Sequence, residues 1–271
     1  MSAPRPSDPP RPEAPRAGSD RRSDALSIAL RLTHGASFTL DVAFEVPPGI
    51  TVLFGPSGSG KSTILAAIAG LARPSGGRIA LGAEVWFDAR TRENKPIHER
   101  RVAFVFQSLA LFPHMTAAEN AAYGIDRALP KDERRRRALA SLTRFHVAHL
   151  ADRRPATFSG GEAQRVALAR AFAMEPRAML LDEPFSALDF TLRHQFIGEL
   201  RAAAHELGVP ILHVTHHRNE ARVLGDRAVL LDHGAVRAQG LIADVLPAMH
   251  RMDPGDGADL SFAETPMHDP L

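Results

Sequence analysis

Cysteine is absent from the sequence, which excludes disulfide bonds, zinc or iron–sulfur centres held by cysteine, and thiol nucleophiles. Long apolar runs are absent too: no eighteen consecutive residues are apolar, and the N-terminal MSAPRPSDPPRPEAPRAGSD has no hydrophobic stretch. We therefore expect no membrane-spanning helix, no secretory signal and a cytoplasmic protein. Lysine is scarce, because Lys61, Lys95 and Lys131 are the only lysines among 33 basic residues. A lysine that falls inside a motif is therefore informative.

The overall composition is that of a globular domain, with 44% hydrophobic and 24% charged residues in a chain of 271. The two ends differ from this average. Residues 1–24 are rich in proline and arginine, and residues 252–271 are acidic and interrupted by proline and glycine. Such segments cannot bury a core, so we expect two disordered tails around one domain at 25–251.

Two different strand patterns occur inside this domain. Apolar and polar residues alternate in ALSIAL and FTLDVAFEV, as in antiparallel strands with one wet face. Farther on, short apolar runs alternate with helical patterns such as STILAAIAGLA, as buried parallel strands do. These runs are ITVLF at 50–54, VAFVF at 102–106, AMLL at 178–181 and PILHV at 210–214. The sequence thus predicts an α/β core with an antiparallel β layer, and a helical segment at 117–176, where no strand pattern occurs.

A phosphate-binding loop follows the first apolar run. The pattern G-x-x-x-x-G-K-[ST] lies between a predicted strand and a predicted helix, which is the context that the motif requires. Glycines let the backbone fold around a phosphate, and the helix N-terminus adds a favourable dipole. We expect Lys61 to bridge the β- and γ-phosphates of ATP and Ser62 to ligate Mg²⁺. The nucleotide-binding segment comprises Gly55, Pro56, Ser57, Gly58, Ser59, Gly60, Lys61, Ser62 and Thr63.

Two acidic residues, Asp182 and Glu183, end the apolar run at 178–181. The carboxyl ends of strands are where open α/β sheets bind their ligands. We expect Asp182 to belong to the Mg²⁺ shell and Glu183 to deprotonate the attacking water. The alternative is that both acids merely cap a following helix.

A second anion-binding turn is predicted at Ser159, Gly160 and Gly161, which open an amphipathic helix. This turn is too far along the chain to belong to the phosphate loop. Two half-sites on one chain indicate assembly with another copy.

With these motifs in order, the sequence resembles the ATP-binding subunits of ABC transporters over residues 25–250. Gln107 after VAFVF, Asp189 in SALD and His216 in HVTHH complete the resemblance. It implies a P-loop NTPase core with an antiparallel layer and a helical subdomain at about 108–176. It also implies roles for three residues: Gln107 near Mg²⁺ and the permease, His216 at the γ-phosphate, and Asp189 at the dimer seam.

The same resemblance implies the partners. Two copies sandwich ATP head to tail, with the phosphate loop of one facing Ser159, Gly160 and Gly161 of the other. The pair binds an integral membrane permease at the cytoplasmic face of the inner membrane, and a substrate-binding protein acts indirectly. Within the family, KPIHERRVAFVFQSLALFPHMTAAENAAYG at 95–124 is most similar to molybdate importers, and relatives for sulfate, phosphate, iron or polyamines share its style.

Several features have an ordinary structural alternative. Phe38 is the candidate for stacking on adenine, but it can equally pack inward from a strand. His213, His216 and His217 could suggest zinc, yet no acid or cysteine completes a site nearby. The arginines at 134–137 indicate a solvated helix face rather than a nucleic-acid surface, so we expect no nucleic acid.

Other functions of such ATPases fit less well. DNA-repair and chromosome-structural ABC ATPases need a long coiled-coil insertion between phosphate loop and signature, and none is present. Translation factors of the family resemble two fused cassettes, and a regulator without turnover would lose Glu183 or His216. Only 55 residues follow His216, so we expect the chain to lack the C-terminal oxyanion-binding domain of molybdate-type ATPases. The departure at Glu162, where glutamine is commonest, should leave the backbone donors intact.

Overall fold

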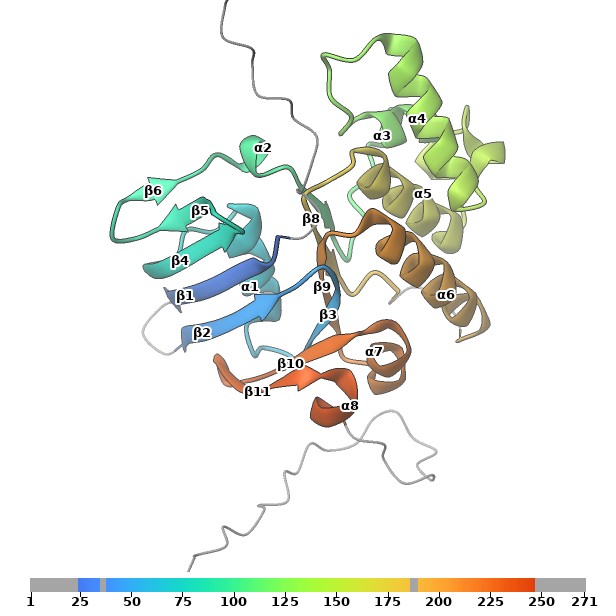
Figure 1. Ribbon diagram of the computed structural model, residues 1–271. Coiled ribbons are helices and arrows are strands. Elements are labelled where there is room, and N and C mark those ends of the chain that lie inside the picture. Colours follow the sequence, from blue (N-terminus) through green and yellow to red (C-terminus); the bar gives the residue numbers. More distant parts are fainter. Residues whose placement is uncertain (1–23, 35–37, 186–189, 247–271) are drawn as a thin grey trace, which may run out of the picture.

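The computed structural model describes residues 24–34, 38–185 and 190–246 (Figure 1). Apart from Asp24, the tails predicted at 1–24 and 252–271 lie outside these ranges, and so does the SALD segment at 186–189.

The described strands form one mixed sheet in the order β6-β5-β4-β1-β2-β11-β10-β3-β9-β8-β7. From β6 to β2 the neighbours run antiparallel, and from β10 to β7 they run parallel. The strands of the first half are β1 (Leu26–His34), β2 (Phe38–Val46), β4 (Gly76–Leu81), β5 (Glu84–Asp88) and β6 (Glu93–Asn94). Those of the second half are β3 (Gly49–Phe54), β7 (Val102–Val105), β8 (Ala178–Asp182), β9 (Pro210–Thr215), β10 (Arg227–Asp232) and β11 (Ala235–Leu241).

The antiparallel half forms because its strands alternate apolar and polar residues. Leu26, Ile28 and Leu30 of β1 are buried, and they lie in register with Val46, Phe44 and Val42 of β2, which are buried as well. The polar residues between them face the other side of the sheet. One face of these strands is therefore buried and the other is exposed to solvent, as predicted.

The parallel half is buried on both faces at its central strands β3, β8 and β9. Helix α1 (Lys61–Ala69) packs between it and the antiparallel layer, where Ile64 and Ile68 share a buried cluster with Leu53 of β3 and Trp86 of β5. Helices α5 (Gly160–Ala173), α6 (Phe190–Leu207) and α7 (Arg218–Leu224) cover the opposite face. Burial from both sides explains why these strands read as continuous apolar runs.

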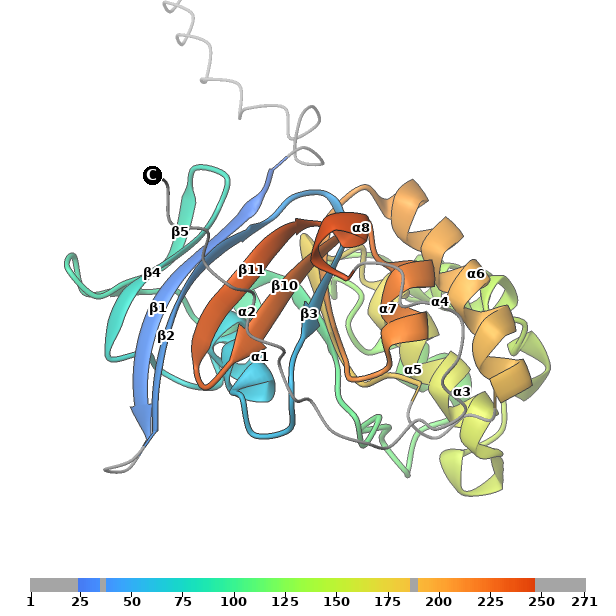
Figure 2. The ribbon, with the colours of Figure 1, turned by 90° about the horizontal axis from the view of Figure 1, so that it is seen from below.

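A helical region connects β7 to β8. Figures 1 and 2 place its helices on the far side of the molecule from the antiparallel strands. Ala118, Leu142 and Phe172 join its three larger helices to one buried cluster. Its elements are α3 (Ala117–Ala122), α4 (Lys131–Arg144), the 3₁₀ turns Ala148–Leu150 and Pro155–Thr157, and α5. Elsewhere the described residues also form the short helices α2 (Ile97–Arg100) and α8 (Ile242–Val245). The predicted α/β core with its antiparallel layer and helical subdomain is thus confirmed.

Helix α1 is shorter than its pattern. STILAAIAGLA extends to Ala72, but the helix ends at Ala69 because Gly70 adopts φ 85°. The amide of Leu71 then bonds back to the Ala66 carbonyl at 2.8 Å, which closes the last turn. A Cβ at position 70 would also lie 2.9 Å from the guanidinium carbon of Arg100, so any other residue there would have to displace this side chain.

Candidate active site

The loop between β3 and α1 wraps around its own lysine. Gly58 and Gly60 have φ values of 79° and 105°, which other residues rarely adopt. The Lys61 Nζ atom donates to the carbonyls of Gly55 and Pro56, both at 2.8 Å. A Cβ on Gly58 would meet no atom within 4 Å, so glycine there serves the backbone angle and leaves open space above the loop.

Charge balance at this loop involves three groups. Burial lowers the pKa of Lys61, and the nearby carboxylates of Glu183 and Asp182 act in the opposite direction. Burial raises the pKa of Asp182 at the end of β8, against a hydrogen bond with the Ser62 hydroxyl and the charge of Lys61. The Ser62 and Asp182 side chains therefore lie together beside the lysine.

This oxygen pair fits a magnesium ion. Mg²⁺ prefers hydroxyl, carboxylate and phosphate oxygens and keeps several of its waters. Ser62 in the first turn of α1 supplies a hydroxyl and Asp182 at the end of β8 a carboxylate, so these residues would hold the ion next to a bound nucleotide.

Glu183 is the point at which three segments meet. Its Oε1 lies 3.0 Å from His216 Nδ1, and its Oε2 accepts from Gln107 Nε2 at 3.4 Å. Gln107 follows β7, Glu183 follows β8 and His216 follows β9. Neighbouring parallel strands end at one edge of the sheet, so side chains far apart in the sequence come together there.

The backbone of Glu183 was not foreseeable from the motif. Its φ is 45°, in the left-handed region, and its amide donates to the Val214 carbonyl at 3.1 Å. Such a conformation costs a non-glycine residue on the order of 1–2 kcal/mol. The bond to β9 holds the carboxylate between Gln107 and His216 despite this cost.

The predicted second anion-binding turn opens helix α5. Ser159 is the N-cap, and its hydroxyl accepts from the Glu162 amide at 3.3 Å. The Glu162 carboxylate accepts from the Ser159 amide at 2.7 Å, and this bond lowers the pKa of Glu162. Ser159 and Gly160 are exposed, so this end of the helix is open to another molecule.

Arg170 is a residue that the sequence analysis missed. From α5 it donates to the carbonyls of Leu109 and Ala110, both at 2.8 Å. These two residues follow Gln107 closely and have left-handed φ values of 60° and 44°. A charged residue among the apolar, buried positions of α5 is the sequence signal that could have identified Arg170.

The remaining candidates have different outcomes. Asp189 lies outside the described residues, and so does the Phe38 side chain, although the Phe38 backbone begins β2. His213 is fully buried in β9. Among the described residues no group of three or more His, Asp or Glu side chains is placed to bind a metal. Within the same ranges, no helix has both the length and the apolar character needed to cross a bilayer.

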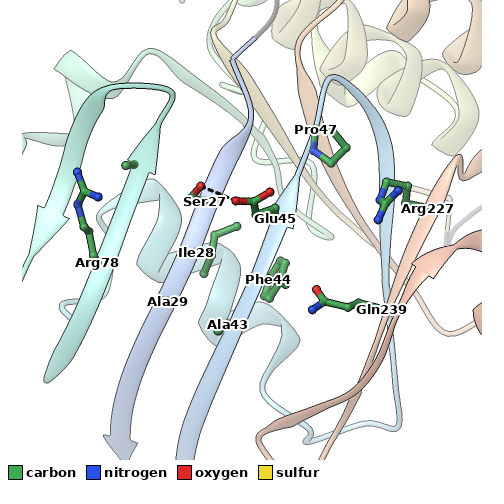
Figure 3. A pocket seen from close by; sticks show the side chains of 11 residues that line it. Ser27, Ile28, Ala29, Ala43, Phe44, Glu45, Pro47, Arg78, Arg227 and Gln239 are labelled. Carbon is green, nitrogen blue, oxygen red and sulfur yellow. Dashed lines mark hydrogen bonds between the residues drawn. The ribbon is translucent and has the colours of Figure 1, made fainter.

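A separate pocket of about 790 Å³ opens on the antiparallel layer (Figure 3). Arg78, Glu45 and Arg227 lie on its walls, with the small residues Ser27 and Ala43 between them. Arg227 is in register with Thr51 in β3, whereas the phosphate loop follows the end of β3 at Phe54. The pocket is therefore distinct from the predicted site.

Comparison with known proteins decides the family. The profile of the family described as ABC transporter matches residues 40–186. The chain belongs to the ABC transporter family. Proteins named molybdenum import ATP-binding protein ModC are similar to it: that of Brucella melitensis is 40% identical over 232 residues, covering 86% of this chain and 64% of the relative. That of Albidiferax ferrireducens is 41% identical, covering 87% and 63%. The chain thus spans less than two thirds of the length of these relatives.

Solved structures agree on the fold. The dimeric bacterial ABC transporter cassette MJ0796 superposes with a TM-score of 0.68 at 30% identity, over 80% of this chain and 98% of that one. The cbiO1 protein of Clostridium perfringens, part of the transporter complex cbiONQ, gives a TM-score of 0.72 at 27% identity, over 82% and 90%. The predicted ABC ATPase fold and the predicted resemblance to molybdate importers are confirmed.

Proposed function

We propose that this chain is the ATP-binding subunit of an ABC importer and hydrolyses ATP to drive uptake of molybdate or a similar oxyanion. The observation that carries the proposal is the convergence of Gln107, Glu183 and His216 beside the loop that holds Lys61. ModC proteins at about 40% identity support molybdate as the cargo.

Each group has a definite part. Lys61 and the loop amides bind the phosphates of ATP, and the glycines let them approach closely. Ser62 and Asp182 would hold a Mg²⁺ ion, which would supply positive charge against the phosphates when bound. Glu183 orients a water molecule and accepts its proton, while His216 holds Glu183 and faces the γ-phosphate. Gln107 contacts the same carboxylate. It lies where the chain passes from β7 into the helical subdomain, so it connects the carboxylate to that subdomain.

The proposed assembly follows from the exposed Ser159 turn. One copy supplies the phosphate loop, and the partner supplies Ser159, Gly160 and Gly161, with Asp189 at the seam and Phe38 beside adenine. A membrane permease binds the dimer on the cytoplasmic face, and a substrate-binding protein delivers the anion. The dimeric cassette MJ0796 supports this arrangement.

The cargo is tested by ATP-driven uptake. We expect the chain, reconstituted with its permease and a molybdate-loaded binding protein, to accumulate molybdate in vesicles. Glu183→Gln should abolish uptake, because an amide accepts a proton poorly. Glu93→Gln on the exposed strand β6 should leave uptake unchanged. Stimulation by a sulfate-, phosphate-, iron- or polyamine-loaded binding protein, with none by molybdate, would contradict the cargo.

The dimer is tested by sedimentation. The Glu183→Gln protein should sediment as a dimer with ATP and as a monomer without it, because each chain owns half of each site. Adding Ser159→Arg should abolish the dimer and leave ATP binding to the monomer intact, and adding Thr91→Arg in an exposed turn should change neither. The same mass with and without ATP would count against the shared sites.

A further inference from the structure

A buried histidine lies in the middle of strand β9. The other residues of this strand are apolar except for Thr215 at its end, and all of its residues are buried. His213 is 0% exposed and stands in register between Val52 of β3 and Leu181 of β8. A polar ring in such surroundings is costly unless another group satisfies it.

Glu220 of helix α7 satisfies one nitrogen of this ring, Nε2, whereas the buried Nδ1 has no hydrogen-bond partner among the described residues. The Nε2 atom of His213 lies 2.7 Å from Oε1 of Glu220, which is only 4% exposed. Burial opposes ionisation of Glu220, but hydrogen bonds from His213 and Thr215 and the charge of His213 outweigh it and lower the pKa of the carboxyl. The pair thus ties the centre of β9 to the helix that follows.

Thr215 extends the pair toward the proposed active site. Its hydroxyl donates to the Glu220 carboxylate and accepts from the His217 amide at 3.1 Å. The two bonds fix the backbone on both sides of His216. His216 is the residue whose Nδ1 reaches Glu183 at 3.0 Å.

The pair also contacts the segment behind Glu183. The Phe185 ring lies 5.8 Å from the His213 ring and is 1% exposed. One small pocket is lined by Glu183, Phe185, Thr215, His216, His217 and Glu220. Both members of the Glu183–His216 contact therefore border the same small cavity as Thr215 and Glu220.

We propose that His213 and Glu220 are positioning residues that act through Thr215 to hold His216 against Glu183. Neither residue touches the nucleotide in this account, and nothing else in the proposed mechanism uses them. The inference rests on the proposed ATP hydrolysis.

A double-mutant cycle on the full chain separates positioning from mere stability. Glu220→Ala should lower kcat for MgATP hydrolysis about tenfold, equivalent to roughly 1.4 kcal/mol in the barrier, and change the equilibrium affinity for ATP less than about twofold. Glu220→Gln keeps an acceptor for His213 and should restore most of kcat. Val223→Ala, on an exposed face of α7, is the matched control.

The decisive measurement is made in the His216→Ala variant. There Glu220→Ala should cause no further loss in single-turnover hydrolysis of radiolabelled ATP, because the residue that it positions is gone. Thr215→Val, which keeps the shape of the side chain and removes the hydroxyl, should reproduce the loss in kcat.

Three results would overturn the proposal. The first is an unchanged kcat in both Glu220→Ala and Thr215→Val. The second is an equal loss with and without His216. The third is a wild-type chain that binds ATP without hydrolysing it, which would refute the proposed function and this inference together.

Discussion

Arg100 shows how much one buried side chain organises. It is 1% exposed and donates to the carbonyls of Ala67 and Ile68 at 3.1 and 2.7 Å, and to those of Trp86 and Lys95 at 3.3 and 3.0 Å. Burial lowers its pKa, but a guanidinium stays charged at neutral pH. The cation thus satisfies the open carbonyl end of α1, whose other end carries the phosphate loop.

Removing this guanidinium should lower the free energy of unfolding. Arg100→Met leaves several buried carbonyls without donors, so we expect a loss of about 3 kcal/mol in the free energy of unfolding, measured by urea denaturation. Arg101→Met changes the exposed neighbour and should stay within about 0.5 kcal/mol. Equal stability of the two variants would contradict this role for Arg100.

At the scale of elements, the strands that read as alternating or continuous apolar runs were predictable, because burial on one face or two leaves a clear pattern. The positions of the loop between β3 and α1 and of the acids at the end of β8 were predictable as well, since the motif spacing places them at strand ends. The left-handed backbone of Glu183 and the pair His213 and Glu220 were not predictable. They depend on contacts between segments that only the folded chain brings together.

Helix α5 links the signature turn to the segment after Gln107 through Arg170. Two hydrogen bonds hold Leu109 and Ala110 in left-handed conformations. Because Gln107 lies two residues before this strained segment, movement of α5 should move the glutamine as well. The structure thus offers a physical path from the Ser159 turn, which we propose to face a second copy, to Glu183.

This path predicts the phenotype of Arg170→Met. Turnover of ATP should fall about tenfold, the equivalent of one such hydrogen bond in the barrier, while ATP affinity is retained. Arg165→Met removes an arginine of the same helix that bonds Glu199 at 2.8 Å instead, and it should lower stability without this loss of turnover. A steady-state ATPase assay with thermal melting separates the two, and equal turnover in both variants would contradict the path.

At the scale of the whole molecule, three neighbouring strand ends of the parallel half bring Gln107, Glu183 and His216 to the edge that we propose to be catalytic, and the Ser159 turn of the helical subdomain is exposed. This arrangement of the two parts agrees with a cassette that closes on ATP against a second copy. Membership in the ABC transporter family and the neighbours MJ0796 and cbiO1 are consistent with it.

The most direct test of this account is MgATP hydrolysis by the purified full chain. We expect turnover that requires Mg²⁺, with Lys61→Ala losing ATP binding and Glu183→Gln retaining ATP binding but turning over at least about a hundredfold more slowly, as expected when a general base is removed. Hydrolysis by Glu183→Gln at the wild-type rate would contradict the assignment of Glu183 as the base that the convergence of Gln107, Glu183 and His216 supports.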